Sequence, residues 1–150
     1  MTDFPIHILL ADDDKDDCLF FRDALNELEI SPTFTEVYDG EQLMQYLEAG
    51  KDLPTVIFLD LNMPRKNGFA CLDDIKCNDH LKHIAVIIFS TFYDKKIADQ
   101  LYEKGAHYYI CKPASFSQLK MTIGHALSLI SKGQLAQPPR ENFILCNLQR

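Results

Sequence analysis

The 150-residue sequence lacks the signals of export and of membrane insertion. No basic segment leads into an apolar one near the N-terminus, and no apolar run approaches the roughly 20 residues that cross a bilayer. The chain also lacks an excess of positive charge, because its formal net charge is -7. That charge argues against nucleic acid or an anionic membrane surface as the main partner. We therefore expect a soluble cytoplasmic protein.

Phosphate loops, repeats and a disulfide pattern are missing as well. No Gly-rich loop of the mononucleotide or dinucleotide type is present, and nothing repeats beyond a strand–helix alternation. The five cysteines are unevenly spaced and mostly lie in apolar segments, so we expect reduced thiols rather than a disulfide framework. They are Cys18, Cys71, Cys77, Cys111 and Cys146.

Five apolar, strand-like runs alternate with five runs of helical period. We expect strands near residues 6–11, 33–37, 54–60, 84–89 and 107–111. We expect helices near residues 14–29, 40–49, 66–77, 93–104 and 115–131. This alternation predicts an α/β fold, in which a parallel sheet carries helices on both faces.

A change of composition marks a boundary near Ser131. Residues 132–140 are polar and contain prolines, which is typical of a linker. Residues 143–148 are apolar again but are too few for an output domain. We favour packing of this tail onto the same domain, while disorder or exchange with a neighbouring subunit stays open.

Four of the five predicted strands deliver a charge or a hydroxyl at their C-terminal ends. These residues are Asp12 and Asp13 after the first strand, Asp60 after the third, Ser90 and Thr91 after the fourth, and Lys112 after the fifth. Parallel sheets bind ligands beyond these ends, where the strand order reverses, so we expect one site there. A carboxylate that ends a buried strand, as Asp60 does, is costly unless something uses it.

The residue types at this site predict phosphoryl transfer. Carboxylates as close as Asp12, Asp13 and Asp60 repel one another unless a cation neutralises them, and an all-oxygen site suits Mg²⁺. Lys112 offers a positive charge to a phosphoryl oxygen. The ensemble predicts that Asp60 becomes an aspartyl phosphate.

These residues, in this order along residues 4–131, resemble the receiver domain of the two-component response regulators, the CheY-like family. The resemblance implies a doubly wound (βα)5 flavodoxin-like sandwich with the strand order 2-1-3-4-5, for which CheY is a known example. It also implies a phosphoacceptor that catalyses its own phosphorylation and slow dephosphorylation. The donor would be a histidine kinase or phosphotransfer protein.

The resemblance also assigns roles to individual residues. Asp60, which opens the motif Asp60-Leu61-Asn62-Met63-Pro64, is the implied phosphoacceptor. Asp12, Asp13 and the backbone carbonyl of Asn62 would bind Mg²⁺ with it. Ser90 is the implied switch hydroxyl, Tyr109 the aromatic that turns inward with it, and Lys112 the lysine of the family, followed by a cis peptide bond to Pro113.

The signal would leave through protein–protein contacts on the face of the fourth helix, fifth strand and fifth helix, with a homodimer possible. Phe92, two residues after Ser90, is bulky and could restrict water and prolong the phosphoryl lifetime. We expect Asp14, Asp16 and Asp17 only to cap and charge the first helix.

Several alternatives stay open. The acids at 12, 14 and 16 resemble the start of a calcium loop, but Asp17 stands where that loop needs glycine. Cys77, His80 and His83 have metal-like spacing but fit a solvated helix end better. A phosphorylation-independent binding module is a second functional hypothesis. A haloacid-dehalogenase-like phosphohydrolase is a third, although Asn62 replaces the second acid that this group needs.

Overall fold

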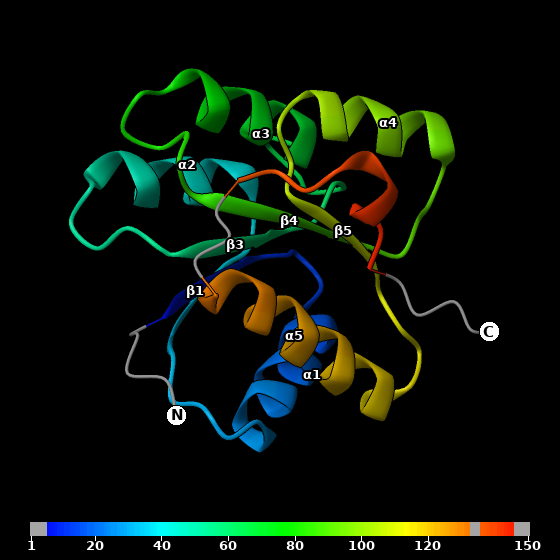
Figure 1. The fold of residues 1–150 in the computed structure, drawn as a ribbon. Coiled ribbons are helices and arrows are strands. Elements are labelled where there is room, and N and C mark those ends of the chain that lie inside the picture. The colour runs from blue at the N-terminus through cyan, green and yellow to red at the C-terminus, as the bar shows by residue number, and fades with distance from the viewer. Residues whose placement is uncertain (1–5, 133–135, 146–150) are drawn as a thin grey trace.

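The computed structural model describes residues 6–132 and 136–145 (Figure 1). Its five strands form one sheet in the order β2-β1-β3-β4-β5, with every pair parallel, so the predicted fold and strand order are confirmed. The strands are β1 (His7–Ala11), β2 (Thr33–Val37), β3 (Val56–Leu59), β4 (Ala85–Ser90) and β5 (Tyr108–Cys111).

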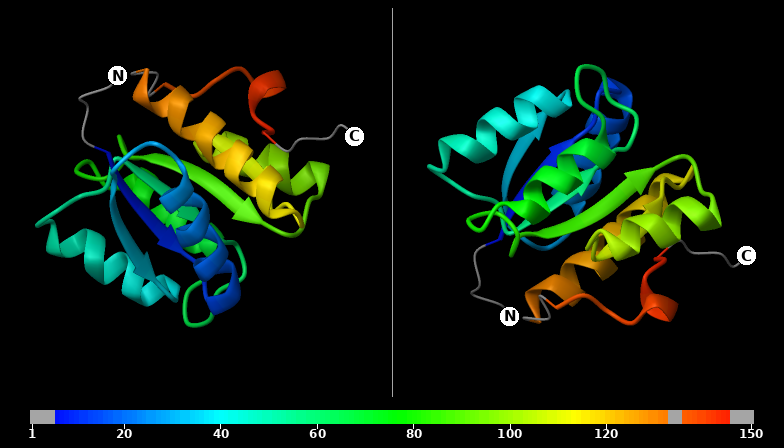
Figure 2. Two further views of the ribbon diagram at one scale, coloured as in Figure 1. Left: turned by 90° about the horizontal axis from the view of Figure 1, so that it is seen from below. Right: turned by 90° about the horizontal axis from the view of Figure 1, so that it is seen from above.

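Helices cover both faces of the sheet. They are α1 (Lys15–Glu27), α2 (Gly40–Ala49), α3 (Gly68–Cys77), α4 (Lys95–Glu103) and α5 (Phe116–Ser131). Helices α2, α3 and α4 lie on one face, and α1 and α5 lie on the other (Figures 1 and 2). Alternate residues of β3 therefore enter two separate cores: Ile57 packs with the first group of helices, and Phe58 packs with the second.

Side-chain caps decide where the helices begin. Each of the five helices starts after a residue whose side-chain oxygen accepts from a backbone N–H of the first turn. Asn67 caps α3 in this way, so that helix starts at Gly68 and not near residue 66. The predicted cap Ser115 is confirmed, because its Oγ accepts from Gln118 N. Gly105, predicted to end the fourth helix, follows it with a φ of 103°.

Residues 136–145, which we call the tail segment, pack along β5. Tyr109 N donates to Phe143 O at 3.0 Å, and Leu145 N donates to Tyr109 O at 2.8 Å, so the segment continues the sheet by one parallel bridge. Phe143 is fully buried among the rings of Tyr102 and Tyr109. Packing onto the same domain, the favoured interpretation, therefore holds for these residues. Residues 146–148 of the predicted apolar run lie outside the described residues.

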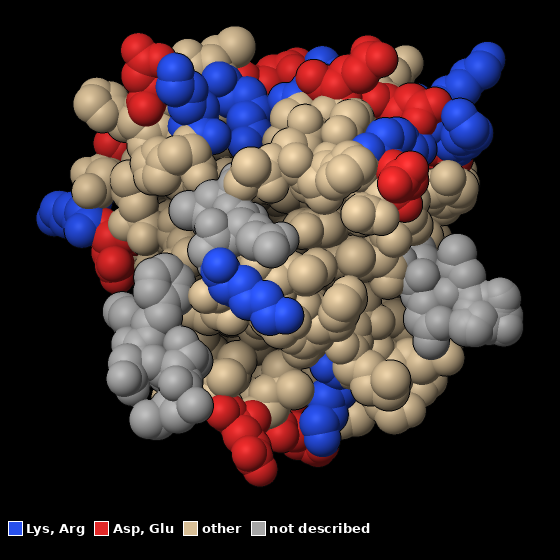
Figure 3. All heavy atoms as spheres, in the orientation of Figure 1, with Lys and Arg blue, Asp and Glu red and all other residues tan. Residues whose placement is uncertain are grey.

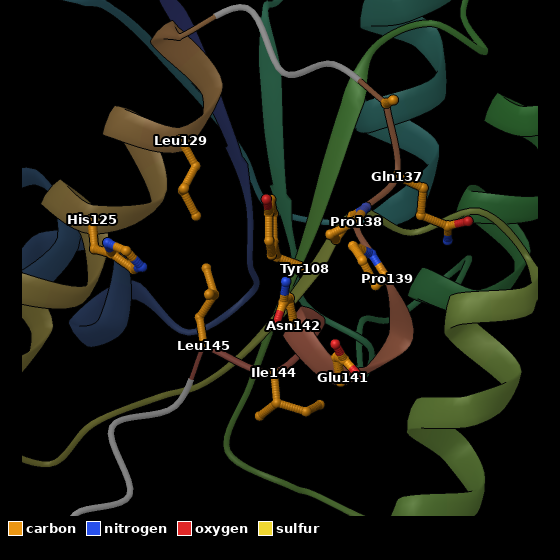
Figure 4. A pocket seen from close by; sticks show the side chains of 11 residues that line it. Tyr108, His125, Leu129, Gln137, Pro138, Pro139, Glu141, Asn142, Ile144 and Leu145 are labelled. Atoms are coloured by element: carbon orange, nitrogen blue, oxygen red, sulfur yellow. The ribbon is translucent and has the colours of Figure 1, made fainter.

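Further contacts hold the tail segment against α4. The Tyr102 hydroxyl donates to Pro138 O at 2.6 Å, and the Gln137 amide donates to Tyr102 O. Arg140 pairs with Asp99 at 2.6 Å. A pocket of about 620 Å³ remains between the segment and α5, with His125 and Leu129 on its helical wall (Figure 4). Residues 136–140, which the sequence marked as part of a linker, thus pack on this face.

Two expectations of the sequence analysis are wrong. No cis peptide bond occurs among the described residues, so the bond between Lys112 and Pro113 is trans. Cys111 is disulfide-bonded, so the expectation of reduced thiols fails at this residue. The thiols of Cys18 and Cys71 are free and buried, and burial raises their pKa values to about 12 and about 11.

The remaining sequence expectations concern Cys146 and the membrane. Cys146 lies outside the described residues. Within the described part of the chain, no helix is both long and apolar enough to span a bilayer.

Candidate functional site

Three carboxylates meet at the carboxyl edge of the sheet. Asp12 follows β1 and is fully buried, Asp60 follows β3 with 6% exposed, and Asp13 is exposed. Each of these acids offers an oxygen within 4.8 Å of the others. The backbone explains the convergence, because Asp60 N donates to Ala11 O at 3.0 Å and thereby continues the pairing of β3 with β1.

The loop after β3 is held tightly against Asp60. Gly68 N donates to Leu61 O at 2.9 Å, which brings the start of α3 over the end of the strand. A Cβ added at Gly68 would lie 2.3 Å from the carbonyl oxygen of Asp60, so only glycine allows this approach. The packing of α3 thus restricts where the Asp60 main chain can lie.

Lys112 enters the same site from β5. Its backbone N donates to Ser90 O at 2.8 Å, and its side chain is 9% exposed. Nζ lies 2.7 Å from Asp12 Oδ2, 2.8 Å from Asp17 Oδ2 and 3.8 Å from Asp60 Oδ2. One buried ammonium therefore faces three carboxylates, and two of these, Asp12 and Asp60, belong to the group of acids that could share a cation.

Burial and mutual repulsion shift the titration of the acids. Burial raises the pKa of Asp60 to about 7; the charge of Lys112 opposes the shift, and that of Asp12 adds to it. Burial likewise raises the pKa of Asp12, against the ion pair with Lys112. Burial alone would lower the pKa of Lys112, but its ion pairs with Asp12 and Asp17 outweigh that effect and raise it. The site thus disfavours two full negative charges unless a further cation is present.

The donor set fits a hard divalent cation. Asp12 Oδ2 accepts no hydrogen bond of good geometry from any described residue, although Lys112 lies close to it. Among the described residues, Asp12, Asp13 and Asp60 form the one group of acids, histidines or cysteines close enough to share an ion. Carboxylate oxygens are the ligands that such cations prefer.

The predicted hydroxyl and aromatic residues meet at Phe92. Ser90 is buried at the end of β4, and its Oγ accepts from Phe92 N at 3.1 Å. The Tyr109 hydroxyl donates to Phe92 O. Tyr109 is fully buried, with Phe143 of the tail segment against its ring. Thr91 is exposed beside Ser90.

Sequence similarity places this arrangement in a known family. The family description "response regulator receiver domain" matches residues 8–124, most of the chain. The chain belongs to the response regulator receiver family. Receiver domains are phosphoacceptor modules of two-component signalling rather than metabolic enzymes, which removes the basis for the phosphohydrolase alternative.

Individual relatives agree with the family. Response regulator Rcp1 of Synechocystis sp. is 31% identical over 126 residues, which span 80% of this receiver and 86% of Rcp1. The probable methanogenesis regulatory protein FilR2 of Methanothrix harundinacea is 28% identical over 123 residues, or 79% of each chain.

Solved receivers have the same fold. The phosphorylated cyanobacterial phytochrome response regulator RcpA superposes with a TM-score of 0.78 at 30% identity, covering 84% of this chain and 94% of RcpA. The Mn²⁺-bound form of Rcp1 gives a TM-score of 0.78 at 27% identity, covering 90% of this chain and 100% of that one.

The sequence analysis missed one contact of this receiver site. Asp17, expected only to charge the helix end, bonds Lys112 across 95 positions of the chain. Asp14 caps α1 and is not in the cation group, which contradicts the calcium-loop alternative. Cys77, His80 and His83 are exposed and do not form a metal group in the described part of the chain.

Proposed function

We propose that Asp60 accepts a phosphoryl group from a histidine kinase or phosphotransfer protein, and that this protein signals through protein–protein contacts. The observation that carries the proposal is the placement of Asp60. Its nearly buried carboxylate shares a cation-sized cluster with Asp12 and Asp13 and lies 3.8 Å from the Lys112 ammonium. This site combines a nucleophile, a cation position and a fixed positive charge.

The transfer would use the groups as follows. The Asp60 carboxylate would form a bond to phosphorus while the bond from phosphorus to the donor histidine breaks. The electron pair of the broken bond would stay on the imidazole nitrogen. Asp12, Asp13, Asp60 and the backbone carbonyl of Asn62 would hold Mg²⁺, which neutralises the acids and admits an anionic phosphoryl group. Lys112 would donate to a phosphoryl oxygen. The Mn²⁺-bound form of the similar Rcp1 supports a divalent cation here.

Ser90 and Tyr109 would carry the change outward. Ser90 would move toward the phosphoryl group, with Thr91 as a second hydroxyl at the same rim. Both Ser90 Oγ and the Tyr109 hydroxyl contact the main chain of Phe92, so a moving Ser90 gives up a bond to the residue that holds Tyr109. The loop between β4 and α4 can therefore couple the site to the outer face.

The face that a partner would read consists of α4, β5 and α5. The tail segment lies on it and contacts Tyr109 directly. In the view of Figure 3, charged side chains gather mostly near the margins, one basic side chain lies near the centre, and much of the remaining surface is uncharged. Such a surface favours a protein partner, including a second copy of this chain, over an ionic ligand.

Intact mass spectrometry with acetyl phosphate tests the proposal. With Mg²⁺ we expect the mass of a single phosphoryl adduct. Asp60→Asn, which keeps the size of the side chain but removes the nucleophile, should show none, and neither should the wild type with a chelator. Full labelling of Asp60→Asn would contradict the assignment. No adduct on the wild type, from acetyl phosphate or from histidine kinases, would favour the phosphorylation-independent binding module.

A further inference from the structure

Lys112 donates a hydrogen bond to Asp17, an acid outside the group of Asp12, Asp13 and Asp60 that could share a cation. Nζ donates to Asp17 Oδ2 at 2.8 Å. The ion pair with Asp12 Oδ2 is as short, at 2.7 Å, but Asp12 belongs to the group of acids that could share a cation. Asp17 lies in the first turn of α1, and its side chain is 29% exposed. The lysine is thus held from the helix as well as from the strand ends.

Asp17 can keep its hydrogen bond to Lys112 when a cation binds, because Asp17 is not one of the acids that would hold the cation. The acids close enough to hold one ion are Asp12, Asp13 and Asp60. A divalent cation bound there would take up lone pairs of Asp12 and Asp60 and would repel the Lys112 ammonium. The bond to Asp17, whose lone pairs the cation does not take up, would then be the attraction least weakened by the cation.

We propose that Asp17 is a positioning residue for the transfer, which holds Lys112 beside Asp60 while the cation is bound. This inference rests on the proposed function. An ammonium has three protons: one is directed at Asp17, a second faces Asp12, and a third is available toward Asp60. The bond to Asp17 can therefore persist while Lys112 donates to a phosphoryl oxygen.

The flexible stem of lysine makes such an anchor useful. A lysine side chain loses considerable rotamer freedom when its end is fixed in one place. Lys112 and Asp17 are bonded before any phosphoryl group arrives, so the loss does not have to occur during the transfer. Without Asp17, the Lys112 ammonium would have to be fixed in place during the transfer itself, against the repulsion of the cation.

The rate of phosphoryl uptake tests the role of Asp17. With Mg²⁺ and acetyl phosphate, Asp17→Asn should take up the phosphoryl group roughly tenfold more slowly than the wild type, and Asp17→Glu should recover part of the rate. The matched control is Asp16→Asn, which removes the same charge from an exposed position in the same turn and should leave the rate unchanged. An equal or faster rate for Asp17→Asn would overturn the proposal.

A second measurement does not depend on phosphorylation. In Mg²⁺, a small amine-reactive reagent should label Lys112 several-fold faster in Asp17→Asn than in the wild type, as read from peptide masses. Asp16→Asn should label like the wild type. Unchanged labelling in Asp17→Asn contradicts the anchor even if the wild type takes up no phosphoryl group. Asp17→Ala, which favours the helix, replaces Asp17→Asn if that variant does not melt cooperatively.

Discussion

The ring of Phe143 lies against the ring of Tyr109, with their centroids 6.3 Å apart and their planes at 73°. The backbones of the same two segments are joined, since Tyr109 N donates to Phe143 O. The residue with the predicted switch role therefore has a partner from the tail segment. Edge-to-face contacts of this kind add to the free energy of burial.

Replacement of Phe143 by alanine should lower the free energy of unfolding by about 3–5 kcal/mol. The side chain is fully buried against Tyr102 and Tyr109, so its removal leaves a cavity in the core. Chemical denaturation measures the change. Phe20→Ala is the matched control, because Phe20 is 54% exposed and the same truncation there should change stability by less than about 1 kcal/mol. A similar, small loss at both positions would mean that the tail segment does not pack as described.

Removal of all residues after Lys132 separates packing within one chain from exchange between chains. The bonds of the tail segment to Tyr109 and of Arg140 to Asp99 all lie within one chain here. We therefore expect the truncated protein to be less stable, with the same number of chains per particle in light scattering as the full chain. A full chain that is dimeric, and a truncated one that is monomeric, would instead establish that the tail bridges subunits.

Local sequence features predicted the sheet well. The apolar runs that became β3 and β4 are buried on both faces and bounded by polar turns, so their identity as strands depends on nearby residues alone. The element ends were less accurate, because side chains such as Asn67 and Asp94 satisfy backbone N–H groups and start helices later than periodicity indicates.

Contacts between distant elements could not be predicted in the same way. Asp17 and Lys112 are 95 residues apart, and periodicity does not say how the start of α1 lies relative to the end of β5. The pairing of Phe143 with Tyr109 depends on a β5 edge that another chain could equally cover. The strand order was available only through the resemblance to a family.

Cation binding should stabilise the protein through Asp13. A ligand that binds only the folded state, at about 100 times its Kd, raises the free energy of unfolding by about 2.7 kcal/mol. Thermal melts over a Mg²⁺ titration should show this rise in the wild type and lose most of it in Asp13→Asn. Asp13 suits the test because it is exposed, so its replacement should leave the fold intact. Asp16→Asn should keep the full rise, and a loss there as well would point to general screening of the acidic surface.

The raised pKa of Asp60 makes the stability of the metal-free protein depend on pH. The unfolded side chain loses its proton near its ordinary pKa of 3.8, whereas the folded one keeps it up to about 7. Between these values the folded state binds one more proton, so this group's contribution to stability is full below about pH 4 and is lost as the pH rises to 7. Asparagine does not titrate. The free energy of unfolding of Asp60→Asn should therefore rise relative to that of the wild type across this window, by up to ~4 kcal/mol at pH 8.

Urea denaturation in a chelator, at several pH values from 4 to 8, measures this difference. Subtraction of the Asp60→Asn curve from the wild-type curve removes the titration of groups that both proteins share. Excess Mg²⁺ should shrink the difference at pH 8, because a bound cation favours the charged form of Asp60 and only the wild type keeps all three carboxylates. A difference that does not vary with pH would mean that the Asp60 carboxylate is already ionised near pH 4. Lys112, 3.8 Å away, would then dominate over burial at this site.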